Sequence, residues 1–315
     1  MTSKKTSSGS KKGAKAAVLP AILAGVPMRA THETNLQFVA FHLETVPDDI
    51  VKNDARILGG TLDHNLPVIF DGAAGDLQKL ATLRYYFQNA SAVEVIPLLR
   101  RAATALANLF RLVAPIGSPV TFNWENVERT VAGAGHMDLQ NGLQLERGLL
   151  LSVISGNRRA RDYLGGLPRD SYEHPQIRLP ATDFAKLATL QSLARGDDAA
   201  ASAQLLDLQK LETPAALGKS ADGYRESSEP DITAAIGAIL NGDVPKCEQA
   251  IAAVLEKHQK TFDSDVENNR NRPNGFMSVN ALMLAQFARE RGIRITLENR
   301  YLPLALLDAA YQPSG

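Results

Sequence analysis

Three times along the chain, an apolar segment ends in a glycine that is followed directly by asparagine or aspartate. These pairs are Gly156-Asn157, Gly196-Asp197 and Gly242-Asp243, and their glycines are 40 and 46 residues apart. Glycine readily adopts the left-handed conformation that closes the last turn of a helix. The Asn or Asp side chain can then cap the first turn of the next helix. Each pair therefore predicts a short turn between two helices.

The segments on both sides of these turns have apolar residues at helical spacing. The clearest stripes are Ile232, Ala235, Ile236, Ile239 and Leu240 before the last turn, and Cys247, Ala250, Ile251, Val254 and Leu255 after it. Two helices joined by a few residues pack antiparallel to bury such stripes. We therefore predict hairpin units around residues 139–164, 181–208 and 231–260. They form either a short tetratricopeptide-like stack of helical repeats or a non-repetitive helical domain that uses one turn type three times.

The composition agrees with an all-α fold class. The 315 residues include 44 Ala and 41 Leu, the strongest helix formers, whereas aromatic residues make up only 6%. Hydrophobic residues at 44% and charged residues at 22% are ordinary for a globular protein and exclude disorder of the whole chain. The polar stretch 211–230 contains Pro214, Gly218 and Gly223, so we expect a loop there.

The first half of the chain is less regular. We expect a helix around residues 35–45 that ends before Pro47, and a turn over residues 71–76 in which Asp76 caps the next helix. Further helices are expected over residues 99–113 and 138–155. Short extended pieces are expected near 119–123 and, because apolar and polar residues alternate there, at Ile293–Leu297.

Residues 1–17 are rich in Lys, Ser and Gly and are expected to form a disordered basic tail. Residues 18–315 are then a single all-helical domain. The apolar stretch 18–26 is short and contains Pro20 and Gly25, which argues against a secretory signal and for a cytoplasmic protein. No apolar run is long enough for a membrane-spanning helix.

The sequence contains none of the common catalytic or nucleotide-binding motifs. Cys247 is the only cysteine of the sequence, which excludes an intrachain disulfide and a Cys-x-x-Cys zinc site. It lies in an apolar stripe, so we expect a buried side chain. The six histidines are scattered along the chain without nearby ligand partners. We therefore expect no catalytic residues, no metal and no cofactor.

The charge of the whole chain is balanced, with 34 basic and 34 acidic residues, which gives no general attraction to nucleic acid or membrane. Residues 197–267, however, contain 14 acidic and 6 basic residues, whereas residues 268–300 contain six Arg and two Glu. Such a stretch suits a protein partner with a basic contact surface, and the alternative is an ordinary solvated helix face. The candidate partner-binding residues are Asp197, Asp198, Asp222, Glu226, Glu229, Asp231 and Asp243, of which Asp197 and Asp243 could equally be helix caps.

The most distinctive segment covers residues 262–303. It contains an Arg, a Pro-Asn-Gly-Phe turn, an Ala/Leu-rich helix that Ser278 caps and that ends in Arg-Gly, and a closing Tyr-Leu-Pro. These signature residues are Arg270, Pro273, Gly275, Phe276, Arg291, Gly292, Tyr301, Leu302 and Pro303. In this pattern the chain resembles the immunity 49 family, whose members occur beside bacterial polymorphic toxins.

The resemblance implies an all-helical immunity protein, or antitoxin, that neutralises one cognate toxin by stoichiometric binding and without catalysis. We expect the signature residues to have a structural role rather than to bind the toxin, because Pro, Gly and Phe in this arrangement fix a backbone. A different hypothesis is a helical-repeat scaffold or adaptor that binds a protein or peptide in a groove between hairpins. A hydrolase that acts on a product of the toxin has no local sequence support.

Overall fold

A computed structural model describes residues 21–23, 28–29, 34–60, 62–135, 137–173, 177, 179–263 and 271–311. The predicted tail, residues 1–17, and the signature residue Arg270 lie outside them. The fold is mostly α-helical, as the composition predicted, with one small antiparallel sheet. The elements are α1 (Leu36–Gly59), α2 (Leu66–Phe87), α3 (Ala92–Arg111), β1 (Pro119–Trp124), β2 (Val127–Ala132), α4 (Gly142–Ile154), α5 (Arg158–Gly165), α6 (Ala181–Arg195), α7 (Asp198–Leu211), α8 (Pro214–Leu217), α9 (Ala221–Glu226), α10 (Glu229–Leu240), α11 (Val244–Phe262), α12 (Val279–Glu290) and α13 (Leu304–Ala310).

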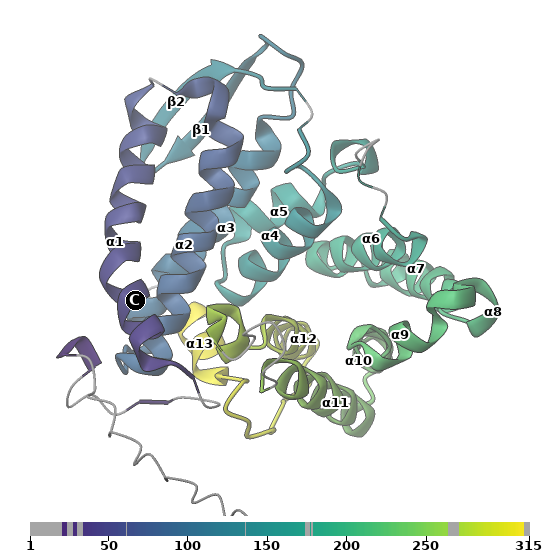
Figure 1. Cartoon of the computed structure of the whole chain (residues 1–315). Coiled ribbons are helices and arrows are strands. Elements are labelled where there is room, and N and C mark those ends of the chain that lie inside the picture. Colours follow the sequence, from purple (N-terminus) through teal and green to yellow (C-terminus); the bar gives the residue numbers. More distant parts are fainter. Residues whose placement is uncertain are drawn as a thin grey trace, which may run out of the picture.

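The helices pack mainly in the order of the chain. Helices α1, α2 and α3 lie side by side, and the β1–β2 hairpin extends across one end of them (Figure 1). Helices α4 and α5 pack on α3, α6–α7 packs on α4 and α5, and α10–α11 follows against α7. Helices α12 and α13 then return to contact α4 and α3. The buried apolar side chains of all these layers form one continuous cluster.

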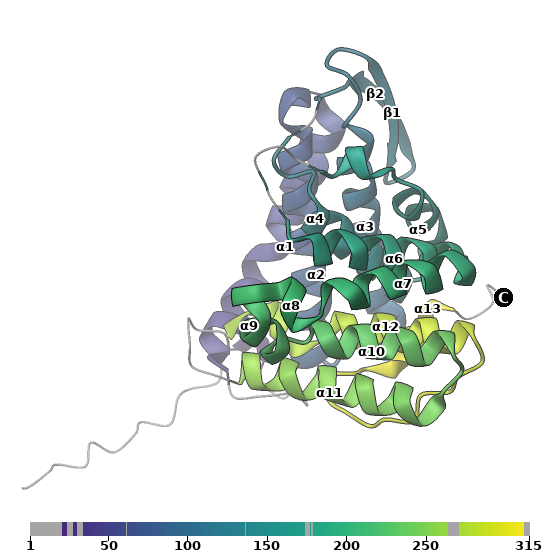
Figure 2. The same ribbon diagram turned by 90° about the vertical axis from the view of Figure 1, so that its right-hand side faces the viewer.

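The three predicted turns have the predicted geometry. Gly156, Gly196 and Gly242 have φ of 66°, 73° and 66°, which is the left-handed conformation. The following side chains accept a hydrogen bond from the backbone N–H three residues on, and the distances are 3.1 Å for Asn157, 3.0 Å for Asp197 and 3.2 Å for Asp243. The pairs α4–α5, α6–α7 and α10–α11 are therefore helical hairpins. Figure 2 shows that the α6–α7 and α10–α11 turns lie at the same edge of the molecule.

The prediction that the first helix ends before Pro47 is wrong. Helix α1 runs through Pro47 to Gly59 and buries one side of its whole length, including Val46 and Ile50. Proline removes one hydrogen bond of the helix, and this burial offsets the loss. Sequence propensity is a weak guide where a helix packs along its full length against a neighbour such as α2.

The predicted turn over residues 71–76 is also wrong. These residues lie inside α2, and Asp76 accepts a hydrogen bond from Asn53 of α1 at 3.3 Å instead of capping a helix. The two glycines of this segment remain helical because α2 is buried on several sides. Next along the chain, Ser91 caps α3 through a capping box with Glu94, earlier than the apolar stripe alone indicated.

The stretch 211–230 is not the expected structureless loop. It forms the short helices α8 and α9 with a 3-10 turn between them. Thr213 caps α8, and Pro214 occupies its first position, where a missing N–H costs little. Glu212 accepts hydrogen bonds from Tyr224 of α9 and Thr233 of α10, which join this segment to α10.

The first predicted extended piece is present, and residues 293–297 lie outside any helix or strand but show the predicted alternation of burial. The first is β1, which pairs antiparallel with β2, a strand that the sequence had not indicated. In the second, Ile293 and Ile295 are buried and alternate with exposed Arg294 and Thr296, as predicted.

The hairpin α10–α11 yields a direct test of this packing. Ile251 is fully buried on α11, whereas its neighbour Ala252 is exposed on the same helix. Ile251→Asp places an unpaired charge in the core and should lower the thermal midpoint by more than about 10 °C or abolish the transition. Ala252→Asp, the matched control, should shift it by less than about 3 °C. Equal melting of the two variants in circular dichroism would contradict the hairpin.

Candidate functional site

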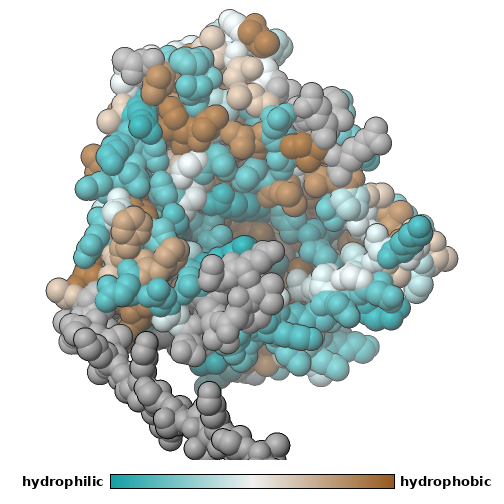
Figure 3. All heavy atoms as spheres, in the orientation of Figure 1, coloured by the Kyte–Doolittle hydropathy of each residue, from teal (hydrophilic) through white to brown (hydrophobic). Residues whose placement is uncertain are grey.

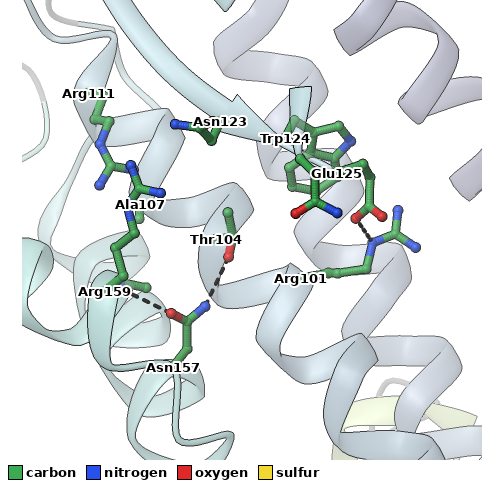
Figure 4. Close-up of a pocket in the computed structure, with 11 residues that line it drawn as sticks. Arg101, Thr104, Ala107, Arg111, Asn123, Trp124, Glu125, Asn157 and Arg159 are labelled. Carbon is green, nitrogen blue, oxygen red and sulfur yellow. Dashed lines mark hydrogen bonds and ion pairs between the residues drawn. The ribbon is translucent and has the colours of Figure 1, made fainter. Parts of the chain in front are cut away.

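A cleft of about 280 Å³ lies between the tip of the β-hairpin and the helices α3 and α5 (Figure 4). Helix α3 forms one wall of the cleft and the first turn of α5 forms the opposite wall. The end of β1 covers the cleft. The lining is polar, with three arginines among it. The residues are Arg101, Thr104, Ala107, Arg111, Asn123, Trp124, Glu125, Asn126, Asn157, Arg159 and Ala160.

The hairpin tip has an unusual backbone. Trp124 pairs with Val127, so Glu125 and Asn126 form a two-residue turn, and both have positive φ, 48° and 65°. This turn type favours Asn-Gly, and a glutamate at its first position costs on the order of 1 kcal/mol or more. The Glu125 carboxylate offsets this cost, because it forms an ion pair with Arg101 at 2.6 Å.

The same arginine anchors the hairpin to the helices. Arg101 of α3 donates to both carboxylate oxygens of Asp54 on α1, at 2.7 and 2.8 Å. The indole N–H of Trp124 donates to Asp54 at 2.9 Å, and its ring packs edge-on against Phe70. Three elements are therefore fixed around one carboxylate, which makes this side of the cleft rigid.

Arg111 and Arg159 form the other side of the cleft. The guanidinium of Arg111 donates to Asn108 at 2.7 Å and stacks over the ring of Tyr163 at 4.2 Å. Burial, together with the nearby charge of Arg159, lowers the pKa of Arg111 from its ordinary value, and Tyr163 acts in the opposite direction. Arginine remains protonated at any physiological pH. This part of the cleft therefore presents two positive charges, and that of Arg111 is held in place by Asn108 and Tyr163.

Other reactive groups lie elsewhere. Cys247 is buried, and burial raises the pKa of its thiol to about 11, so it is an unreactive core side chain. Within the described ranges, no three His, Cys, Asp or Glu side chains are grouped so that they could hold a metal ion. The chemistry that the cleft offers is the binding of an anionic group.

The predicted acidic residues are spread over several environments. Asp197 and Asp243 cap α7 and α11, and the hydrogen bonds from Lys246 lower the pKa of the Asp243 carboxyl. Asp198 pairs with Arg291, a signature residue that lies 93 positions away in the sequence. Asp231 pairs with Lys257 at 2.7 Å.

Glu229 belongs to a buried cluster of charges. The ammonium of Lys186 on α6 lies 2.9 Å from Glu146 of α4 and 2.9 Å from Glu229 of α10, and its side chain is only 7% exposed. Burial favours the neutral amine, but the two carboxylates outweigh it and raise the pKa of Lys186 well above its ordinary value. The cluster therefore connects three helices from three different hairpins.

Two of the predicted acids, Asp222 and Glu226, are exposed, cap no helix and form no ion pair with another helix in the described part of the chain. Asp222 forms a loose pair with Arg225 of the same turn, at 3.6 Å, and Glu226 is exposed beside a shallow groove with Asp231 and Lys257. The structure thus does not bring the seven acids together into one patch.

The described signature residues pack between α2, α11 and α12. Phe276 is fully buried and contacts Phe87 edge-on, with ring centroids 4.8 Å apart. A Cβ on Gly275 would lie 2.4 Å from the ring of Phe262, so only glycine fits there. Gly292 has φ of 78° and follows the end of α12. Its neighbour Arg291 forms an ion pair with Asp198 of α7. The remaining members, Pro273, Tyr301, Leu302 and Pro303, lie in the adjoining turn and in the buried segment that leads into α13.

Sequence reasoning missed the arginine cleft and the buried lysine. Arg111 and Arg159 are 48 positions apart and meet only because α5 packs on α3. The consecutive arginines at the start of α5 were a weak signal, since basic residues are unfavourable near a helix N-terminus.

The Lys186 cluster gives a quantitative prediction. Lys186→Met should lower the free energy of unfolding by about 3–5 kcal/mol, because it leaves the Glu146 carboxylate buried and uncompensated. Lys210→Met, the control, removes a 75% exposed lysine and should change it by less than about 0.5 kcal/mol. Urea denaturation at pH 7 measures both. Adding Glu146→Gln to Lys186→Met should recover part of the loss, and equal stability of the two lysine variants would refute the role of the cluster.

The chain was compared with protein families, curated proteins and solved structures. The family model described as Immunity protein 49 matches residues 75–306, which include the hairpins, the cleft and the described signature. Comparison with curated proteins and with solved structures gives no match. Since the matched region covers most of the 315 residues, the chain belongs to the immunity protein 49 family.

Proposed function

We propose that the protein is an antitoxin that binds one cognate bacterial toxin in a stoichiometric complex and blocks it without chemistry. The observation that carries this proposal is the family match over residues 75–306, because an immunity protein acts against a toxin partner. The all-helical architecture that the resemblance implied agrees with it.

A non-enzymatic role is supported by the side chains of the cleft. Its arginines and asparagines bind and orient anionic groups, but an arginine cannot exchange a proton at physiological pH. Arg101 and Glu125 neutralise one another in an ion pair, so neither is poised as a general acid or base. We propose that occupancy of the toxin, rather than turnover, produces immunity.

We also propose that the protein acts in the cytoplasm of the toxin-producing cell, where a toxin made there is first encountered. Within the residues that the structure describes, no helix is long and apolar enough to cross a membrane.

Co-expression with the product of the neighbouring gene tests the proposal. We expect a complex of fixed stoichiometry in light scattering after gel filtration, and growth of cells that express the active toxin only when the protein is present. If no complex forms and the cells are not protected, the antitoxin assignment is wrong, and binding to unrelated partners would favour the scaffold hypothesis.

We further propose that Asp222 and Glu226 attract a basic region of the toxin over a distance. Asp222→Lys with Glu226→Lys should slow association at least roughly tenfold at low salt, and the difference should shrink as salt rises. Both residues are exposed and lack ion pairs to other helices in the described structure, so the fold should persist.

The matched control reverses Glu44 and Asp48, two exposed acids on α1, and so changes the net charge by the same amount. Stopped-flow association rates should be altered much less by this control. Equal rates for the two double variants would show that the acids near α9 have no specific role.

A further inference from the structure

We propose that the cleft between the hairpin tip and α5 receives an acidic side chain of the toxin, which Arg111 and Arg159 bind through its carboxylate. This inference rests on the proposed function and names the contact through which the toxin is held. It is independent of the exposed acids near α9, which concern the approach of the partner.

The positive charge on this wall of the cleft is not balanced. Figure 4 shows the side chains of Arg111 and Arg159 pointing toward one another along one wall of the cleft. Within the described part of the chain, no carboxylate forms an ion pair with either. Two neighbouring positive charges repel each other where the surroundings are partly desolvated. A carboxylate placed between them would remove the repulsion and accept charge-assisted hydrogen bonds.

The guanidinium of Arg111 is preorganised for binding. Tyr163 and Asn108 hold the plane of the Arg111 guanidinium, and the hydrogen bond to Asn108 occupies one of its five N–H donors. Asn108 itself is fully buried and donates to the backbone carbonyl of Asn123 at 2.9 Å. Because the donor group is already oriented, binding loses little side-chain freedom.

The hairpin turn above the cleft is strained. Glu125 and Asn126 keep left-handed backbone angles, and the ion pair of Arg101 holds the tip over the cleft. Such conformations persist where the surrounding structure enforces them, and they concentrate at binding sites. The tip therefore has a fixed position from which it can contact a partner.

The size of the cleft and the surface around it favour a protein ligand over a nucleic acid. A volume of about 280 Å³ is smaller than the usual site for a drug-sized ligand and suits a side chain. Next to the tip, Val127 is 45% exposed, and Figure 3 shows further hydrophobic surface over the upper half of the molecule, where α1 and the hairpin lie. Protein interfaces combine such apolar surface with arginine, whereas nucleic acid needs a longer basic track.

The test uses Arg111→Gln with Arg159→Gln in the full chain. We expect the dissociation constant for the cognate toxin to rise at least roughly 100-fold, mainly through faster dissociation. The control, Arg158→Gln, removes an exposed arginine from the same turn of α5 and should change it less than about threefold. Arg111→Lys with Arg159→Lys keeps both charges and should restore part of the affinity.

A partner scan then identifies the acid. Each exposed Asp or Glu of the toxin is changed to its amide in turn. One of these toxin variants should bind the parent protein more weakly than the unchanged toxin does. The same toxin variant should bind the Arg111/Arg159 double glutamine variant about as well as the unchanged toxin does. Trp124 is the only tryptophan of the chain and lines the cleft, so its fluorescence should change on binding the parent toxin and change less with that toxin variant.

The outcomes separate this inference from the proposed function. If the parent protein binds and protects but the double glutamine variant binds as tightly, only the cleft assignment is overturned. A short single-stranded oligonucleotide and inorganic phosphate serve as further probes. Trp124 fluorescence that responds to the oligonucleotide in the parent but not in the double variant, with toxin affinity unchanged, would overturn the protein ligand in favour of nucleic acid. A response to phosphate alone would overturn it in favour of a free anion.

Discussion

The fold depends on a glycine turn that joins two helices at three places in the chain. In each, the N–H that follows the glycine donates to a carbonyl five residues earlier, at 2.9, 3.0 and 2.9 Å for Asn157, Asp197 and Asp243. Another residue would pay roughly 1–2 kcal/mol for the left-handed backbone. Because the turns are alike, the helices of each pair run antiparallel, and their apolar stripes face one another.

Charged side chains then join the hairpins to each other. Arg161 of α5 donates to the carbonyl of Ala194 at the end of α6 and pairs with Glu290 at the end of α12. Arg291 reaches Asp198 at the start of α7, and Lys186 holds carboxylates from α4 and α10. Much of the charge that the sequence suggested for a partner is therefore used inside the molecule. Arg111 and Arg159 are different, since they lie together along one wall of an open cleft and form no ion pair with a carboxylate in the described part of the chain.

The elements that could be predicted are those determined by neighbours in the sequence. The glycine turns, the caps by Asn157, Asp197 and Asp243, and the alternation at Ile293 and Ile295 all depend on residues a few positions apart. The helix through Pro47 was missed because its stability comes from burial against other helices. The cleft was missed for a related reason, since no local pattern shows that Arg111 and Arg159 meet or that Asp198 is paired with Arg291.

The inhibition of the cognate toxin as a function of molar ratio tests most directly whether the protein acts by occupying its partner. At toxin concentrations far above the dissociation constant, stoichiometric binding predicts that activity falls linearly and ends at a fixed ratio of protein to toxin, regardless of incubation time. Complete inhibition by a small fraction of an equivalent, increasing with time, would instead show that the protein acts catalytically and would contradict the account.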